Sequence, residues 1–365
     1  MFADLERILV FLKRLNLQTG SDESAHSRWV KFWRDNPAVR GRSTSPSLGW
    51  VLEVEREIVG FFGNLPRRYR LGPVDVEVSV ATSWAVEKEF RSHTKLLSAA
   101  YFAQTDVDIL MVTTAIKPTA RIFSNFSSHP MPQADYGEVL FWVINSRQFL
   151  FSALLKTRIR KNLATVLSYT LSPLLGLVKA LRIRSCSFRG GHLQVTKCEL
   201  DSIGLDFDDL WQRKLTEKPR LFASRQAEDM RWATSLAALS HEMSLLVYRA
   251  DDRLQGYILL AKERAAHIPL QRAKVIDLFV VDDDLEITSA LLAAAFADAE
   301  KSGCDVFEII GFPGNLRALF RSHRPFTRWY HCHPFYFKAL SADMASSLQA
   351  TSGWYPSPFD GDSFL

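Results

Sequence analysis

The chain has 365 residues, more than one ordinary hydrophobic core accommodates, so we expect two domains. Its hydrophobic share of 47% and charged share of 23% are typical of a folded globular protein and argue against a disordered or fibrous chain. The net charge of +5 permits an anionic ligand. Lys and Arg are scattered apart from clusters at 67–70 and 156–161, so we expect no nucleic-acid partner.

The cysteine pattern and the first residues predict a cytoplasmic protein. The cysteines are widely spaced and form no Cys-x-x-Cys pair, which favours reduced thiols over disulfides or a zinc module. They are Cys186, Cys198, Cys304 and Cys332. Residues 2–15 predict an amphipathic helix rather than a secretory signal, because charged residues bracket the short apolar run at 8–12.

An apolar stretch at 163–181 has about the length of a membrane-spanning helix. It contains Pro173 near its middle, and proline breaks or kinks a helix. We therefore expect two short helices that join the halves of the chain. The alternative is an element on a membrane surface, which leaves a peripheral membrane contact open.

In chain order, the first half predicts a mixed sheet with helices against it. A helix at 24–35 precedes two strands, at 50–54 and 58–62, that form a hairpin around a charged turn. Residues 74–80 alternate between valine and polar residues, as in a strand with one buried face, and this strand continues to 86. A helix at 92–104, a strand at 107–113, a helix at 118–126 and a strand at 138–144 follow.

Much of this order recurs in the second half, which predicts an internal repeat of structure. The expected elements are strands at 244–248, 255–260 and 273–280, a helix at 284–302, a strand at 306–310, a helix at 315–322 and a strand at 331–339. The predicted fold class is therefore α/β (α+β), with two mixed β-sheet domains and flanking helices. We expect domains at 1–150 and 206–340, a helical linker at 151–205 and a C-terminal tail at 341–365 that either covers a cleft or is disordered.

The segment at 84–96 is the clearest candidate binding site. It lies where the alternating strand gives way to a helix, and a helix N-terminus offers free backbone N–H groups and a partial positive charge to a phosphate. Arg91, His93 and Lys95 add positive charge at this point.

This segment resembles the GNAT superfamily of acetyl-CoA-type N-acyltransferases, which carry Val-x-x-x-x-Arg-x-x-Gly-x-Gly/Ala between such a strand and helix. Val86 and Arg91 match that spacing, whereas Thr94 and Leu96 stand where the family has small residues. The departure matters because glycine lets the loop backbone approach phosphates closely. The resemblance extends over most of the chain and implies a tandem GNAT-like N-acyltransferase.

The resemblance implies acyl-CoA as a co-substrate rather than a permanently bound cofactor, and no metal. It places the site in the first half, between the strands that end near 86 and 113. The implied contacts are Trp84, Ala85 and Val86, whose backbone would pair with the pantetheine amides, and Arg91, Ser92, His93, Thr94 and Lys95, which would hold the pyrophosphate.

A general base is needed if the acceptor is an ammonium group. Glu77 is the first candidate, because it lies on the polar face of the alternating strand, where GNAT-like enzymes often carry a carboxylate; a solvated strand residue is the equal alternative. His129, after the helix at 118–126, is the second candidate. The tyrosine that many members use to protonate the leaving thiolate has no counterpart, because this helix carries Phe123 and Phe126 instead.

The second half predicts no coenzyme site. Asp282, Asp283 and Asp284 follow its strand at 273–280, and carboxylates repel a pyrophosphate but suit a helix N-terminus. We therefore expect one coenzyme site per chain, in the first half. Two histidines flank a cysteine at 331–333, but no further ligand pair lies nearby in sequence, so a structural role is favoured over a metal site.

Together, these patterns predict transfer of an acyl group from acyl-CoA to an amine. The expected partner is a small-molecule acceptor, such as a sugar, an amino acid or another metabolite, that enters between the halves. One alternative is a Fem-like transferase that uses aminoacyl-tRNA. The other is a catalytically inactive GNAT-like protein that binds a partner or a membrane surface through 156–181.

Overall fold

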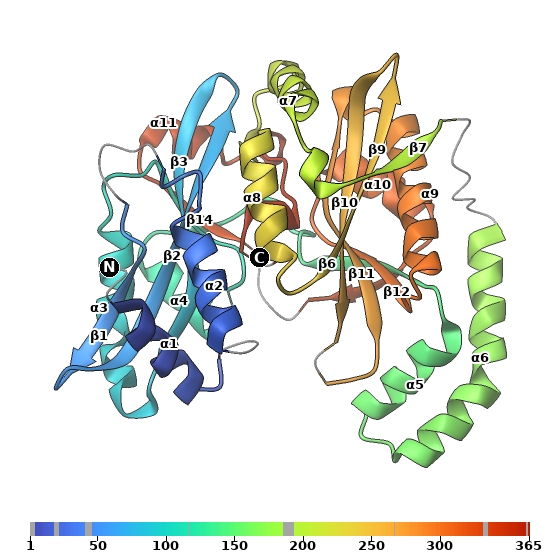
Figure 1. Ribbon diagram of the computed structural model, residues 1–365, viewed down its shortest axis with the longest axis horizontal. Helices are drawn as coiled ribbons and strands as arrows, with labels where there is room; N and C mark the ends of the chain where they lie inside the picture. The colour runs from blue at the N-terminus through green and yellow to red at the C-terminus, as the bar shows by residue number, and fades with distance from the viewer. Residues whose placement is uncertain are drawn as a thin grey trace.

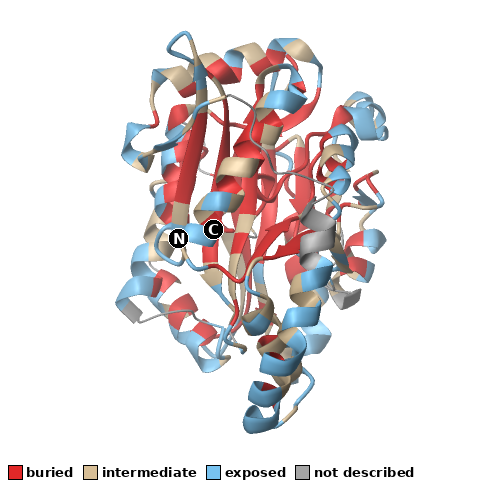
Figure 2. Ribbon diagram, turned by 90° about the vertical axis from the view of Figure 1, so that its right-hand side faces the viewer, coloured by how far each residue is buried: buried red, intermediate tan, exposed pale blue. Residues whose placement is uncertain are grey.

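The computed structural model describes residues 4–17, 22–40, 46–115, 117–184, 193–265, 267–330, 335–362 and 364–365. Over these ranges the chain forms two seven-stranded mixed sheets that stand beside each other, with helices packed against them (Figure 1). The strands are largely buried, and the helices expose their outer faces (Figure 2). The predicted α/β class with two mixed sheets is confirmed.

The first sheet has the strand order β1-β2-β3-β4-β14-β5, with β8 paired to the far end of β2. Its strands are β1 (Gly49–Val54), β2 (Glu57–Leu71), β3 (Val74–Val86), β4 (Ile109–Val112), β5 (His129–Pro130), β8 (Leu221–Ala223) and β14 (Tyr336–Ala339). The predicted alternation in β3 is confirmed, because Val76, Val78 and Val80 are buried in the largest hydrophobic core.

The second sheet has the order β13-β6-β12-β11-β10-β9-β7. Its strands are β6 (Glu138–Val143), β7 (Val195–Cys198), β9 (Glu242–Ala250), β10 (Arg253–Arg264), β11 (Gln271–Val280), β12 (Val306–Ile309) and β13 (Phe326–Trp329). Apart from β7 and β8, the two sheets share one pattern, with a single parallel pair in the middle: β3 with β4, and β11 with β12. The predicted internal repeat is therefore visible in the topology.

Each half gives one strand to the other half's sheet. β6 was expected in the first domain but pairs with β12 and β13 of the second sheet. β14 was expected in the second domain but pairs with β4 and β5 of the first. These two assignments were wrong because sequence pattern reports that a strand exists and not which sheet it joins. β7 also lies within the expected linker but pairs with β9.

The helices flank the sheets in chain order. They are α1 (Leu5–Arg14), α2 (Asp22–Trp33), α3 (Thr94–Phe102), α4 (Lys117–Asn125), α5 (Ser146–Lys156), α6 (Lys161–Arg184), α7 (Leu205–Glu217), α8 (Ala227–Ala237), α9 (Leu285–Lys301), α10 (Gly314–Ser322) and α11 (Ala342–Ser347). Short 3₁₀ turns lie at Lys88–His93, Leu200–Ser202, Val281–Asp283, Thr351–Gly353 and Pro358–Asp360. The predicted amphipathic helix near the N-terminus is α1, which buries Leu5, Ile8, Leu9 and Leu12.

The prediction of two short helices across 163–181 was wrong, because α6 continues through Pro173. Proline cannot donate to the carbonyl four residues earlier, which here belongs to Tyr169. The hydroxyl of Ser172 donates to that carbonyl oxygen instead, at 3.2 Å. Within the described residues, no helix is long and apolar enough to cross a membrane.

The C-terminal tail is ordered rather than disordered over its described residues. It leaves β14 through α11 and returns between the two sheets, where residues 353–361 are buried (Figure 1). The main-chain carbonyl of Asp360 accepts a hydrogen bond from the hydroxyl of Tyr69, and that of Phe359 accepts one from Arg67 at 3.0 Å. The tail is thus built into the boundary between the halves.

Candidate active site

The first sheet opens between its two parallel strands. β3 pairs with β4 only through Val78, Ser79 and Val80, and then continues to residue 86 without pairing to β4. β3 also bulges, because two of its residues, Ser83 and Trp84, lie opposite a single residue of β2. The φ angle of Ser83 is 47°, which places it in the left-handed region.

A cavity of about 220 Å³ occupies this opening, and we call it the strand cleft. Its walls come from β2, β3, the end of β4 and α4. They are Phe62, Ala81, Thr82, Ser83, Trp84, Val112, Thr114, Ala115, Thr119 and Phe123. The cleft therefore lies where the resemblance to GNAT enzymes predicts the coenzyme.

A second hollow of about 530 Å³ continues from the strand cleft toward the start of α3, and we call it the helix groove. It is lined by Leu15, Leu17, Trp84, Ala85, Val86, Lys88, Arg91, Thr94, Thr119 and Ile122. Trp84 and Thr119 line both hollows, so the strand cleft and the helix groove are neighbours. The indole N–H of Trp84 is buried and has no hydrogen-bond partner among the described residues, which is rare for a buried donor.

The predicted cofactor residues divide into two groups. Trp84, Ala85, Val86, Arg91 and Thr94 line the helix groove together. Ser92, His93 and Lys95 are exposed beside it and are not among its lining residues. A 3₁₀ turn (Lys88–His93) precedes α3, so of the predicted residues only Thr94 and Lys95 belong to the first turn of the α-helix itself.

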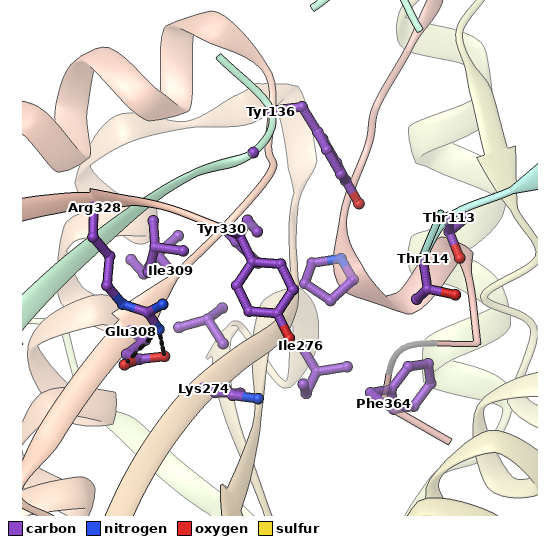
Figure 3. Close-up of a pocket in the computed structure, with 15 residues that line it drawn as sticks. Thr113, Thr114, Tyr136, Lys274, Ile276, Glu308, Ile309, Arg328, Tyr330 and Phe364 are labelled. Carbon is purple, nitrogen blue, oxygen red and sulfur yellow. Dashed lines mark hydrogen bonds and ion pairs between the residues drawn. The ribbon is translucent and has the colours of Figure 1, made fainter. Parts of the chain in front are cut away.

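A third hollow lies between the two halves, and we call it the central pocket. It has a volume of about 220 Å³ and mostly apolar walls. Its lining residues are Thr113, Thr114, Tyr136, Gly137, Val139, Lys274, Val275, Ile276, Glu308, Ile309, Ile310, Arg328, Tyr330, Pro358 and Phe364. Figure 3 shows the two threonines on one side of the pocket and the ion pair of Arg328 with Glu308, at 3.0 Å, on the other.

Asp362 lies where the central pocket meets the strand cleft. Thr114 lines both hollows, and its hydroxyl donates to Oδ1 of Asp362 at 3.3 Å. The hydroxyl of Thr113 donates to the same oxygen at 2.9 Å, and Thr82 supplies a further hydrogen bond. Burial raises the pKa of the Asp362 carboxyl above its ordinary value despite these bonds. A raised pKa makes a carboxylate a stronger base than an ordinary one, which suits the removal of a proton.

Tyr136 extends its hydroxyl into the central pocket (Figure 3). Burial raises the pKa of this hydroxyl above its ordinary value, and the charges of Asp360 and Asp362 raise it further. Tyr136 therefore stays protonated at physiological pH and can donate a hydrogen bond. Sequence reasoning missed Tyr136 because it searched for a tyrosine in α4.

The two predicted catalytic residues lie away from these hollows. Glu77 sits on β3 just before the pairing with β4, about 16 Å along the strand from Thr82 at the usual rise per residue. It is not among the residues that line the three hollows. His129 is exposed on the edge strand β5, and β14 separates that strand from β4. A catalytic role for either residue stays a prediction.

Comparison with known proteins was made at the levels of sequence and of structure. No protein-family model and no curated protein matches the sequence. A GCN5-related N-acetyltransferase from Anabaena variabilis ATCC 29413 is 12% identical, with a TM-score of 0.58 over 96% of this chain and 74% of that one. A GCN5-related N-acetyltransferase from Kribbella flavida is 13% identical, with a TM-score of 0.56 over 95% and 71%.

A third similar structure is a conserved protein of unknown function and probable N-acyltransferase from Enterococcus faecalis V583. It is 10% identical, with a TM-score of 0.56 over 93% of this chain and 70% of that one. This chain has the GNAT fold. The resemblance predicted from the segment at 84–96 is thereby confirmed at the level of the fold.

The second sheet of this GNAT fold opens in the same way as the first, but the C-terminal tail occupies the opening. β11 pairs with β12 only through residues 272–274 and then diverges from it. Across the gap, the hydroxyl of Tyr355 donates to the carbonyl of Leu278 on β11, at 2.6 Å. The carbonyl of Pro356 accepts from the N–H of Phe312, just beyond β12, also at 2.6 Å. The tail thus bridges the two diverging strands.

A buried ionic cluster fixes the tail in this position. Arg225 donates to both carboxylate oxygens of Asp277 on β11 and to Asp360 of the tail, each at 3.0 Å. Ser357 donates to Asp277 at 2.9 Å. All four side chains are buried. Because removing one member of such a cluster leaves uncompensated buried charge, the cluster holds the tail strongly in this opening.

Two of the three aspartates at the start of α9 (Leu285–Lys301) have structural partners. Asp284 caps α9 by accepting from the N–H groups of Glu286 and Ile287. Asp283 is buried against Lys214 at 2.6 Å and Arg220 at 2.7 Å. Burial alone would raise the pKa of Asp283, but these two cations hold it below the ordinary value. Asp284 thus acts as a helix cap and Asp283 as the anion of a buried ion-pair cluster. That this half binds no coenzyme stays a prediction.

Among the described residues, no group of three His, Cys, Asp or Glu side chains is arranged to hold a metal ion. The residues at 331–333, for which a structural role was predicted, lie outside the described residues, as do Cys186 and Cys332. Of the other cysteines, Cys304 is buried, and neither it nor Cys198 forms a disulfide.

Proposed function

We propose that this protein is an acyl-CoA-dependent N-acyltransferase with one coenzyme site, in the first half. Acyl-CoA would lie along the unpaired edge of β3, with its pantetheine arm in the strand cleft. Its phosphates would lie in the helix groove near Arg91 and the N-terminus of α3, where backbone N–H groups and positive charge are available. The GNAT fold and the opening between β3 and β4 support this placement.

The observation that carries the proposal is the position of Asp362. Its carboxylate is held by Thr114, the residue shared by the strand cleft and the central pocket. A thioester at the end of the strand cleft and an amine in the central pocket would therefore meet beside this carboxylate. We propose Asp362, in place of Glu77, as the general base.

The proposed reaction is transfer of the acyl group from the thioester to the acceptor's amine. Asp362 removes a proton from the acceptor's ammonium group, and the free amine attacks the carbonyl carbon of the thioester. The new C–N bond forms as the C–S bond breaks, and the second proton of the attacking nitrogen passes to the departing thiolate, so that coenzyme A leaves as its thiol. Asp362 then returns its proton to solvent. Tyr136 can donate a hydrogen bond to the acceptor or to the departing sulfur, because its hydroxyl stays protonated. Proton transfer by a positioned side chain typically contributes 10²–10⁴-fold in rate, roughly.

The central pocket suits a small acceptor. Its volume of about 220 Å³ fits a compact amine with an apolar portion better than the end of a transfer RNA. Tyr136 and Tyr330 line it beside aliphatic side chains, and the paired Arg328 and Glu308 close one side. We therefore favour an amine of a sugar, amino acid or small metabolite over the Fem-like alternative.

The test is release of coenzyme A thiol from acetyl-CoA in the presence of a panel of small amines. At least one amine should release thiol with the wild-type protein, and Asp362→Asn should slow this release by roughly 10²–10⁴-fold. Glu77→Gln, which changes a carboxylate on β3 away from the three hollows, should retain the rate. Tight acetyl-CoA binding without release of thiol for any amine would favour an inactive binding protein. An equal loss of rate in both variants would contradict the assignment of Asp362 as the general base.

A further inference from the structure

A helical arm formed by α5 and α6 projects from the second half, on the side away from the first (Figures 1 and 2). The sequence of this region is unusual in charge. Residues 139–198 contain ten Lys or Arg and no Asp or Glu. Because the whole chain has a net charge of only +5, the remainder is net acidic. Eight of these ten cations lie within residues 146–184, the span of α5 and α6, so positive charge is concentrated on the arm rather than spread over the molecule.

One face of α6 packs and the opposite face is apolar and open. Ala164 and Ser168 are buried, and α6 packs against α5. The outer face presents an apolar stripe at helical spacing, and every member is more than half exposed. Its members are Leu163 (53% exposed), Val166 (59%), Leu174 (62%) and Leu177 (59%). An exposed row of large aliphatic side chains marks a contact surface rather than an ordinary solvated helix.

A basic cluster lies at the corner where α5 ends and α6 begins, next in sequence to Leu163, the first member of the stripe. It comprises Lys156, Arg158, Arg160 and Lys161, which are all exposed. None of these four side chains forms an ion pair with any residue that the structure describes. Nearby, Arg147 stacks over the ring of Tyr169 at 4.7 Å, and that tyrosine is itself 58% exposed. The stripe, the basic cluster and Tyr169 thus give the arm an exposed surface of aliphatic, cationic and aromatic groups.

We propose that this surface docks on an anionic lipid bilayer. The apolar stripe of α6 would enter the boundary between headgroups and acyl chains, and the basic cluster would contact the headgroups. The charge pattern argues against a second copy of the arm, because two such surfaces would repel and neither offers an acidic partner. The apolar stripe argues against nucleic acid as the partner, because nucleic acid would contact the cations and leave the stripe exposed. The proposal does not depend on the acyltransferase activity.

The test is co-sedimentation of the full chain with phosphatidylcholine vesicles that contain or lack phosphatidylglycerol. Wild type should partition onto the anionic vesicles and weakly or not at all onto the neutral ones. Each cation near an anionic surface adds about fivefold to partitioning, so Arg158→Gln with Arg160→Gln should reduce binding about 25-fold. Leu174→Ser with Leu177→Ser should reduce it at least about tenfold, since both side chains would leave the bilayer.

Matched controls are Arg34→Gln, in the first half, and Leu205→Ser, which removes a side chain that is 85% exposed at the start of α7. Both should bind vesicles like wild type, and circular dichroism should confirm that every variant is folded. Absence of wild-type binding to anionic vesicles would overturn the proposal. So would binding that the leucine variant leaves intact, which would indicate simple charge attraction, or a dimer in sedimentation velocity that the leucine variant abolishes.

Discussion

Gly361→Ala should disable the proposed active site by moving Asp362. The φ angle of Gly361 is −121°, which any residue can adopt, so the substitution introduces no backbone strain of its own. Its added Cβ would lie 2.1 Å from Oγ1 and 2.6 Å from Cβ of Thr113. Carbon contacts need about 3.5 Å, so the tail or Thr113 must move by roughly 1 Å. The bond of 2.9 Å between Thr113 and Asp362 would not survive that shift.

A misplacement of this size typically costs about 10²-fold in rate. We expect kcat/KM for acetyl-CoA and the best amine to fall by about that factor. Acetyl-CoA affinity, measured by calorimetry, should change little, because Gly361 does not line the strand cleft or the helix groove. Gly314→Ala is the matched control, since no atom lies within 4 Å of its added Cβ. An unchanged rate for Gly361→Ala would refute the assignment of Asp362.

Three further predictions concern pH, coenzyme stoichiometry and assembly of the fold. Because burial raises the pKa of Asp362, the rate should fall as pH drops through that raised value, and Asp362→Asn should abolish this limb of the profile. The same shift means that folding is favoured when the Asp362 carboxyl is protonated. Its contribution to stability is greatest below the pKa of the unfolded state and is lost as pH rises through the pKa of the folded state. Asp362→Asn should therefore not lower the Tm at neutral pH. Calorimetry should give one coenzyme bound per chain. Arg91→Ala should weaken the binding free energy by about 1.5–3 kcal/mol, the value of a hydrogen bond to a charged group, and a folded Asp283→Ala variant should bind like wild type. Two equivalent sites would contradict the asymmetry of the halves. A fragment of residues 1–150 should not fold alone, because it lacks β14, and a cooperative thermal transition in that fragment would show the strand exchange to be dispensable.

Local pattern was enough to predict most strands and helices. Alternating valines identified β3, and the apolar run after α3 identified β4, because burial on one or both faces leaves a period in the sequence. The exchange of β6 and β14 between sheets left no such trace, since each strand satisfies the same burial in either sheet. α6 was misjudged because Pro173 was weighed without the hydroxyl of Ser172, which satisfies the carbonyl that proline leaves open.

The candidate site was only partly accessible to sequence reasoning. The segment at 84–96 was found because its residues are contiguous and because a motif between a strand and a helix N-terminus suits phosphate binding. Asp362 lies about 280 residues away in sequence from Thr82 and reaches it only because the tail returns between the sheets. One signal was present, a glycine between two aspartates at 360–362, but its meaning depends on the close approach of Gly361 to Thr113.

The central claim is that acyl-CoA enters the first half and meets its acceptor beside Asp362. A crystal structure of the full chain with acetyl-CoA tests this most directly. The account predicts one coenzyme, with pantetheine along Trp84, Ala85 and Val86, phosphates near Arg91, and the thioester at the junction with the central pocket. Coenzyme A in the second half against Asp283, or a thioester remote from Asp362, would contradict it.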